Sequence, residues 1–371
     1  MFFIHAKKQT NIIQDFIIMS NILENKTNTP LSEYGEFGLI DYLTKNNTIK
    51  NKSTVLGIGD DAAVIDVKKR LQVVSTDILT EGIHFDIHYS PLKHVGYKAI
   101  ATNLSDVAAM NAKPEQVLVS IAVSSRFTVE AVAEIYKGIY ACCEHYGVDL
   151  VGGDTTSSVS GLFICVTVLG YADEKKIVKR STAQENDLIC VSGDLGAAYM
   201  GLLILEREKK VFLENPDVQP ELEGYSYLLE RQLKPEPRLD IVAELEKHSI
   251  IPTSMIDISD GLASEIMHIC EKSDKGCAIY EDKIPIETKA YTTALDFGMV
   301  PSVSALNGGE DYELLFTIKQ EDYEKIQQIN DISVIGYIKD KYSGCSMITT
   351  DEKSIELTAQ GWDAYRKTIN N

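Results

Sequence analysis

Five short aspartate-containing stretches constrain this chain more than any other feature of its sequence. They are Gly59-Asp60-Asp61-Ala62, Ser75-Thr76-Asp77, Asn103-Leu104-Ser105-Asp106, Gly152-Gly153-Asp154-Thr155 and Asp257-Ile258-Ser259-Asp260-Gly261. Each places a carboxylate beside a small or hydroxyl-bearing residue, at the expected end of a strand or helix. Mg²⁺ prefers oxygen ligands and is usually held by carboxylates together with substrate phosphates. The recurrence therefore predicts a site built around several magnesium ions.

The acidic balance of the chain argues against several classes of partner. With 36 Lys and Arg against 55 Asp and Glu, the formal charge is −19 at pH 7. Nucleic acids and anionic membranes are bound by clustered Lys and Arg, so neither is expected. No apolar run approaches the roughly 18–20 residues that a membrane span needs. Seven cysteines without a CxxC pair, most of them in apolar stretches, indicate reduced thiols and a cytoplasmic protein.

The length of 371 residues is enough for two domains. Apolar β-rich runs alternate with helix-period segments, which predicts an α/β (α+β) fold of two units, each with a sheet covered by helices. The charged stretch 173–187 is expected to connect them, so the predicted units are 31–172 and 173–371. Residues 1–30 are expected to form a poorly ordered extension without a signal peptide, and Met19 is a candidate natural start.

The pattern also predicts individual elements. Thr128 is expected to cap a helix that runs to about Tyr146. The acidic stretch 213–233 has a helix-like pattern, but the sequence does not indicate where it lies in the fold. The other expected helices are 91–110, 196–207, 239–248 and 262–272, and the expected strands are 55–67, 71–79, 117–123, 149–153, 162–171, 188–192, 255–258 and 313–318.

The stretch 57–62 matches the dinucleotide-binding pattern G-x-G-x-x-A, but that interpretation is rejected. Such glycines must open a helix whose N-terminus meets a pyrophosphate, whereas Ala63-Val64-Ile65-Asp66-Val67 is typical of a strand. Asp60 and Asp61 would also repel a pyrophosphate unless Mg²⁺ lay between them. A turn with solvated aspartates is the structural alternative.

The other stretches have structural alternatives as well. Ser75-Thr76-Asp77 would also suit a turn or a helix cap, and Ser259 or Asp260 would suit the N-cap of the next helix. The glycine pair before Asp154 would let backbone amides approach a ligand. His84 and His88 are four residues apart, but without a helical pattern around them a two-histidine metal site is not expected.

Taken together, these residues resemble the thiamine-monophosphate kinase family, within the PurM-like superfamily that includes aminoimidazole ribonucleotide synthetase and selenophosphate synthetase. The resemblance runs from about Gly35 to the C-terminus. Its most specific parts are Glu36-Phe37-Gly38-Leu39-Ile40, Ser75-Thr76-Asp77, Thr80-Glu81-Gly82-Ile83-His84-Phe85, Asn103-Leu104-Ser105-Asp106 and Gly308-Gly309-Glu310-Asp311-Tyr312-Glu313-Leu314.

The resemblance implies ATP-dependent phosphorylation of thiamine monophosphate to thiamine diphosphate with Mg²⁺, by a homodimer paired through its N-terminal domains. It implies three substrate contacts, His84, Glu310 and Trp362, although a lone tryptophan near the chain end also suits a hydrophobic anchor. The implied ATP contacts are Tyr136, Gly153, Asp154, Arg180 and Ser259. The implied metal ligands are Asp60, Ser75, Thr76, Asp77, Asp106, Asp154, Asp257 and Asp260.

The sequence offers no convincing catalytic histidine or lysine, and the chemistry of a phosphate acceptor does not require one. A phosphomonoester has a second pKa near ~6 and is already largely ionised at pH 7, so no general base is needed. The expected mechanism is direct in-line transfer between phosphates whose charge is neutralised by several Mg²⁺ ions. A selenophosphate synthetase would place a reactive Cys early in the chain, whereas the first cysteine here is Cys142. A binding module without catalysis is the rival from another class.

Overall fold

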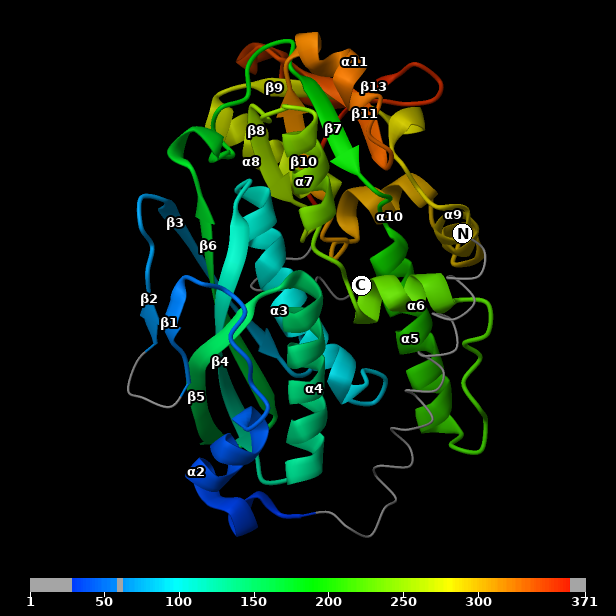
Figure 1. Ribbon diagram of the computed structural model, residues 1–371. Helices are drawn as coiled ribbons and strands as arrows, with labels where there is room; N and C mark the ends of the chain where they lie inside the picture. The colour runs from blue at the N-terminus through cyan, green and yellow to red at the C-terminus, as the bar shows by residue number, and fades with distance from the viewer. Residues whose placement is uncertain (1–28, 59–62, 361–371) are drawn as a thin grey trace.

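The computed structural model describes residues 29–58 and 63–360, and Figure 1 shows two units whose sheets lie one above the other in that view. The connection between them carries the short 3₁₀ turn η1 (Glu174–Lys176). Each unit has its own β-sheet and hydrophobic core. The predicted α/β architecture is therefore confirmed. Within the described residues no helix is long and apolar enough to cross a membrane.

The N-terminal unit is a four-stranded sheet with helices on one face. Strands β3 (Leu71–Thr80), β6 (Leu162–Ala172), β4 (Lys113–Ser124) and β5 (Asp149–Ser158) lie side by side in that order. The β4–β5 pair is parallel and the other two pairs are antiparallel. Helix α2 (Leu31–Thr44) packs near β5, and a small hairpin of β1 (Thr54–Leu56) and β2 (Val64–Ile65) lies at the edge of the unit in Figure 1.

Helices α3 (Leu92–Ala109) and α4 (Val129–Tyr146) pack tightly against each other over this sheet. A Cβ added at Gly96 would lie 1.9 Å from the Ile135 carbonyl oxygen, and one at Gly138 would lie 1.8 Å from that of Lys93. Two glycines therefore let the helix backbones approach directly. As predicted, Thr128 caps α4 by accepting a hydrogen bond from the Ala131 amide.

The C-terminal unit contains a seven-stranded mixed sheet. Its strand order is β13 (Ser354–Glu356), β12 (Cys345–Ile348), β9 (Gly276–Tyr280), β11 (Ile332–Lys339), β7 (Leu188–Ser192), β10 (Leu314–Ile318) and β8 (Ser254–Asp257). Only the β12–β9 pair is parallel. The helices of this unit are α5 (Ala197–Glu214), α6 (Ser226–Leu233), α7 (Leu239–Lys247), α8 (Leu262–Ser273), α9 (Thr288–Asp296), α10 (Pro301–Asn307) and α11 (Tyr323–Ile326). Three further 3₁₀ turns are η2 (Glu281–Lys283), η3 (Gln320–Asp322) and η4 (Lys341–Ser343).

Helix α3 lies between the two units and contacts β3 on one side and β8 on the other. It is buried along almost its whole length, including polar residues such as Lys98, Asn103 and Ser105. Buried polar side chains need hydrogen-bond partners. Lys98 and Ser105 find theirs in the C-terminal unit, at Glu310 and Asp257, and so mark where the two units meet.

Most predicted elements are confirmed within one to three residues of the observed bounds. However, β1 and β2 replace one long strand, β4 begins four residues before 117, β5 ends five residues after 153, and α5 runs seven residues past Arg207. The helix-like stretch 213–233 holds only the end of α5 and the short α6, with turns between them. Strands β9, β11, β12 and β13 were not predicted.

Residues 1–28 of the predicted N-terminal extension lie outside the described part of the chain. Thr29 donates hydrogen bonds to the Glu130 carboxylate through its amide and its hydroxyl.

Candidate functional site

Three of the predicted carboxylates meet at the junction of the units. Asp77 comes from β3, Asp106 from α3 and Asp257 from the end of β8. Asp77 and Asp106 lie close enough for each to affect the pKa of the other. Burial, followed by the charge of a neighbouring carboxylate, raises the pKa of Asp106 to about 6 and that of Asp257 to about 7, and the pKa of Asp77 is also raised. The trio therefore concentrates negative charge in one place, with Asp257 buried, Asp106 half-buried and Asp77 exposed.

Small polar side chains hold these carboxylates in place. Ser75 donates a hydrogen bond to Asp106, and Ser105 donates one of 2.7 Å to the Oδ2 atom of Asp257. The Asn103 side chain accepts a 3.2 Å hydrogen bond from the Asp77 amide. The Asn103-Leu104-Ser105-Asp106 stretch thus positions carboxylates of both units from a single helix. The predicted Ser75 lies beside them.

A fourth carboxylate, that of the buried Glu265 on α8, belongs to the same neighbourhood. Its Oε1 atom accepts a 3.0 Å hydrogen bond from the Asp260 amide and lies 3.5 Å from the Ser259 hydroxyl. Burial raises its pKa to about 8, with further contributions from the charges of Asp260 and Asp257. Helix α8 begins after Gly261 without a side-chain cap. The alternative that Ser259 or Asp260 is a simple N-cap is therefore wrong.

Arg180 brings positive charge to the trio from the connecting segment. It is exposed, and its charge lowers the pKa values of Asp106 and Asp257 against the larger effect of burial. An exposed guanidinium beside several carboxylates suits a ligand whose phosphates lie between them, because guanidinium binds phosphate oxygens through paired hydrogen bonds.

A second polar cluster contains the predicted substrate residues His84 and Glu310. The buried Lys98 Nζ atom lies 2.8 Å from Glu310 Oε1 and donates a 3.3 Å hydrogen bond to the His84 carbonyl. Gln232 donates to the other oxygen of Glu310. Burial lowers the pKa of His84, whose Nδ1 atom accepts a 3.0 Å hydrogen bond from the Thr80 amide. The imidazole is therefore neutral, with its hydrogen on Nε2.

This second cluster borders a small cavity of about 40 Å³. Ligand pockets typically measure about 300–1,000 Å³, so the cavity accounts for only part of a binding site. Its lining combines polar groups with apolar and aromatic side chains, namely Ile83, His84, Phe85, Tyr89, Ser90, Val95, Lys98, Leu202, Gln232, Leu233 and Glu310.

Backbone hydrogen bonds join the loop of the carboxylate trio to the loop of Glu310. The Glu310 amide donates to the Ser259 carbonyl at 2.7 Å, and the Tyr312 amide donates to the Ile258 carbonyl at 2.8 Å. Glu310 and Tyr312 both have positive φ angles, of 58° and 52°. Strained backbone of this kind persists where surrounding structure fixes it, often at ligand sites. The two predicted motifs thus form one unit.

The side chain of Thr76, which the resemblance implies as a metal ligand, does not point toward the trio. Successive side chains of a strand alternate between faces, so Thr76 points away from the face of Ser75 and Asp77. Its hydroxyl donates a 3.0 Å hydrogen bond to the Val166 carbonyl and lies 2.9 Å from the Thr167 hydroxyl.

Asp154 also lies apart, exposed on the edge strand β5. Register pairs place Asp77, Val166, Val119 and Gly153 in one row across the sheet. Three strand spacings of about 4.8 Å separate the ends of that row by about 14 Å. Within one chain the backbones of Asp154 and Asp77 are therefore far apart.

The glycine pair before Asp154 has a structural role that the sequence prediction missed. A Cβ at Gly153 would lie 1.8 Å from the Val119 carbonyl oxygen, so this glycine lets β5 pack against β4. Tyr136, a predicted ATP contact, is buried on α4, close enough to Thr155 for that residue to affect its pKa. Burial raises its pKa to about 12.

Two predicted residues, Asp60 and Trp362, lie outside the described ranges 29–58 and 63–360.

Three residues of the site were not predicted from the sequence. Lys98 lies two helical turns before Asp106 on α3, a spacing that could have indicated it. Glu265 carried no such signal. The buried Tyr312 lies close enough to Glu310 and Asp257 for their charges to raise its pKa further above its usual value.

Comparison with known proteins gives the family. Residues 59–172 match the family described as AIR synthase related protein, N-terminal domain. A thiamine-monophosphate kinase of Bacillus subtilis (strain 168) is 34% identical over 342 residues, covering 89% of this chain and 99% of the relative. The chain belongs to the thiamine-monophosphate kinase family. A family member from Buchnera aphidicola subsp. Schizaphis graminum is 37% identical over 330 residues, covering 87% of this chain and 97% of the relative.

Solved structures of the family agree with the fold. Thiamine-monophosphate kinase from Stenotrophomonas maltophilia K279a superimposes with a TM-score of 0.73 at 28% identity, covering 86% of this chain and 96% of its own. AaThiL complexed with AMPPCP and TMP superimposes with a TM-score of 0.68 at 31% identity, covering 92% and 100%. The hydrogenase maturation protein HypE, at 18% identity, shares the fold.

Proposed function

We propose that this chain transfers the γ-phosphoryl group of ATP to thiamine monophosphate, giving ADP and thiamine diphosphate, the last step of thiamine diphosphate synthesis. The observation that carries the proposal is the convergence of Asp77, Asp106 and Asp257 beside the cluster of His84, Lys98 and Glu310. Family membership and the relative that binds AMPPCP and TMP support the same reaction.

The residues present fit Mg²⁺. Their donors are carboxylate and hydroxyl oxygens, which hard cations prefer. The raised pKa values of Asp106 and Asp257 also mean that nearby positive charge would stabilise their ionised forms. Asp77, Asp106 and Asp257 would hold metal ions together, Asp260 and Asp154 would hold others, and bound Mg²⁺ would neutralise phosphate charge. Asp60 is proposed as a ligand from sequence alone.

The chain's own residues then position and shield two anions. Arg180 approaches the trio from the connecting segment and would bind the nucleotide phosphates, with Ser259 on the opposite loop. The acceptor phosphate is ionised at pH 7 and needs no base, so transfer is proposed to be direct and in line. Trapping a labelled phosphoprotein that forms and decays at the rate of turnover would contradict this mechanism.

Thiamine monophosphate is proposed to bind at the second cluster. Glu310 offers a carboxylate to the cationic thiazolium ring, and the neutral His84 offers its Nε2 hydrogen. Lys98 already neutralises Glu310 in this structure, so the ligand would share that carboxylate with the lysine. Trp362 is proposed, from the sequence, to stack on the ligand's rings.

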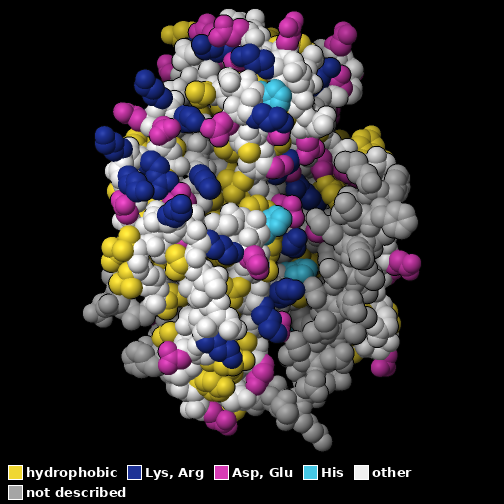
Figure 2. Space-filling model, viewed as in Figure 1, with side chains coloured by type: hydrophobic (Ala, Val, Ile, Leu, Met, Phe, Trp, Pro, Cys, Tyr) yellow, Lys and Arg dark blue, Asp and Glu magenta, His cyan; other side chains and the backbone are white. Residues whose placement is uncertain are grey.

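The protein is further proposed to act as a cytoplasmic homodimer paired through the N-terminal sheet. Val74 and Ile78 are 58% and 53% exposed on the face of β3 opposite to Asp77. Figure 2 shows more hydrophobic side chains at the edge of this unit, where Val55 and Val64 of the β1–β2 hairpin are 67% and 49% exposed. Exposed apolar side chains grouped on a surface are typical of an interaction site.

Turnover tests the proposal against its rivals. A nucleotide-binding module without catalysis would bind ATP and thiamine monophosphate but release no ADP. We expect ADP release that depends on thiamine monophosphate and Mg²⁺, and none with unphosphorylated thiamine as acceptor. ADP release without transfer, or transfer to another acceptor only, would contradict the proposed reaction.

A further inference from the structure

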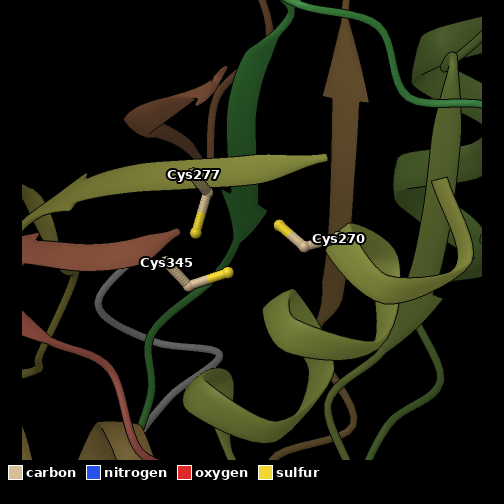
Figure 3. A group of neighbouring side chains, drawn as sticks. All are labelled: Cys270, Cys277 and Cys345. Carbon is tan, nitrogen blue, oxygen red and sulfur yellow. The ribbon is translucent and has the colours of Figure 1, made fainter. Parts of the chain in front are cut away.

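Three cysteines from three elements of the C-terminal unit come together away from the carboxylates. Cys270 lies on α8, Cys277 on β9 and Cys345 on β12, and their Sγ atoms all lie within 4.8 Å of one another. Figure 3 shows the three thiols pointing toward a common centre. Cys270 and Cys277 are buried, whereas Cys345 is half-buried.

The fold explains this convergence. Strands β9 and β12 are parallel, and Cys277 and Cys345 are register partners, so their side chains leave the sheet on the same face. Helix α8 ends at Ser273, and a turn leads directly into β9, which brings Cys270 over that face. Cys270 lies five residues after Glu265, about 7.5 Å along α8, and no carboxylate of the described residues joins the three thiols. The cysteines therefore form a separate site from the carboxylates.

The spacing suits thiolate ligands of one metal ion. With Zn–S bonds of about 2.3 Å in a tetrahedral site, neighbouring sulfur atoms would lie about 3.8 Å apart. The observed upper limit of 4.8 Å needs only small side-chain movements.

We propose that Cys270, Cys277 and Cys345 bind a thiophilic metal ion, with Zn²⁺ as the ion tested, and that binding joins α8 to the β9–β12 pair. Binding would release the thiol protons to solvent, since thiolates are the ligands. Among the described residues no fourth His, Asp, Glu or Cys joins the group, so a water molecule would complete a tetrahedral site. In a reducing compartment, grouped cysteines are more often metal ligands than disulfides.

The experiment uses the full chain, reduced and stripped of metal, in saturating Mg²⁺ so that the carboxylates are occupied. Cd²⁺ serves as the probe because its thiolate complexes absorb in the ultraviolet, which carboxylate complexes do not. We expect a charge-transfer band that saturates at one Cd²⁺ per chain and is lost on adding Zn²⁺. No band at one equivalent would overturn the proposal.

Two serine variants make the result specific. C345S removes the half-exposed ligand at small packing cost, and we expect it to weaken binding by about 100-fold or more, beyond the loss typical of outer-shell changes. C165S changes a half-buried cysteine on β6 and should bind like the unmodified chain. Circular dichroism and kinase turnover report that both variants are folded. Equal affinity in C345S would overturn the proposal.

Thermal unfolding gives an independent readout. An ion that binds only the folded state raises the melting temperature by mass action. Zn²⁺ should therefore raise the melting temperature of the unmodified chain and of C165S, but not of C345S. A shift of equal size in all three would place the zinc elsewhere and contradict the assignment.

Discussion

Ser105 on α3 donates a 2.7 Å hydrogen bond to Asp257 at the end of β8, so a single hydroxyl joins the two units at the carboxylate trio. We predict that Ser105→Ala destabilises the fold by about 1–3 kcal/mol, since a buried acceptor is left without its donor. It should also weaken activation by Mg²⁺, because Asp257 loses its positioning bond. Urea unfolding and a Mg²⁺ titration of turnover measure the two effects.

Ser302→Ala provides the matched control for that variant. Ser302 is also a buried serine that donates a 2.7 Å hydrogen bond to a carboxylate, that of Glu281, but far from the trio in sequence. It should lose stability and keep its Mg²⁺ dependence. If both variants changed the Mg²⁺ dependence equally, the effect at Ser105 would be a general consequence of destabilisation.

Asp77→Asn should remove activity while leaving the fold intact. The substitution removes one charge from a group of carboxylates that repel one another, so the Mg²⁺-free protein should be at least as stable as the unmodified chain. We expect turnover to fall by about 10²–10³-fold, the usual loss when one electrostatic contact of a transition state is removed. The exposed Asp296→Asn serves as control. Near-normal turnover of Asp77→Asn at limiting Mg²⁺ would refute the metal assignment.

The stability of the Mg²⁺-free protein should fall as the pH rises. An aspartate of the unfolded chain titrates near about 3.9, whereas the folded pKa values of Asp106 and Asp257 are about 6 and about 7. The folded state therefore binds more protons, and its stability decreases between about pH 4 and pH 7.

Mg²⁺ should reverse that loss by replacing the protons. Its stabilising effect should grow over the same pH interval, which melting curves with Mg²⁺ or a chelator at about pH 5.5 and about pH 7.5 would measure. A Mg²⁺ effect of equal size at both pH values would mean that the buried carboxylates are not its ligands.

Glu310→Gln should weaken binding of thiamine monophosphate without affecting ATP. The substitution keeps an oxygen for Gln232 but removes the charge that Lys98 and the thiazolium would share. A hydrogen bond or contact involving a charged group contributes about 1.5–3 kcal/mol, so the KM for thiamine monophosphate should rise by roughly 10- to 100-fold. The KM for ATP is the internal control, and an equal rise in both would place Glu310 outside the acceptor site.

Ile78→Glu should disrupt the proposed dimer, because it places a charge in an apolar surface on the open face of β3. Sedimentation analysis should show a shift to monomer, with Val159→Glu, at a fully exposed loop position, as control. A dimer of unchanged affinity in Ile78→Glu would mean that the chains pair elsewhere.

Local sequence patterns were sufficient for the elements with strong periodicity or a clear cap. Helix α4 has both, since apolar residues recur on one face and Thr128 precedes it. Strands β11, β12 and β13 were missed because they are short or carry no clear alternation, and only their neighbours in the sheet define them.

The site residues likewise divide into those that a local motif predicts and those that only the folded structure reveals. Asp77, Asp106 and Asp257 were predicted from motifs, but their closeness depends on how α3 packs between β3 and β8. The sequence motif does not show that the Thr76 side chain faces away from Ser75 and Asp77, because adjacent strand residues face opposite sides. Lys98 and Glu265 were missed because burial, which is a property of the fold, is what makes a lysine or a glutamate significant there.

The most direct test of the account is the formation of thiamine diphosphate by the purified chain from ATP and thiamine monophosphate, followed by chromatography. We predict stoichiometric formation of ADP and thiamine diphosphate that requires Mg²⁺ and is lost in Asp77→Asn. A folded protein that binds both substrates in Mg²⁺ but forms no thiamine diphosphate would contradict the central claim.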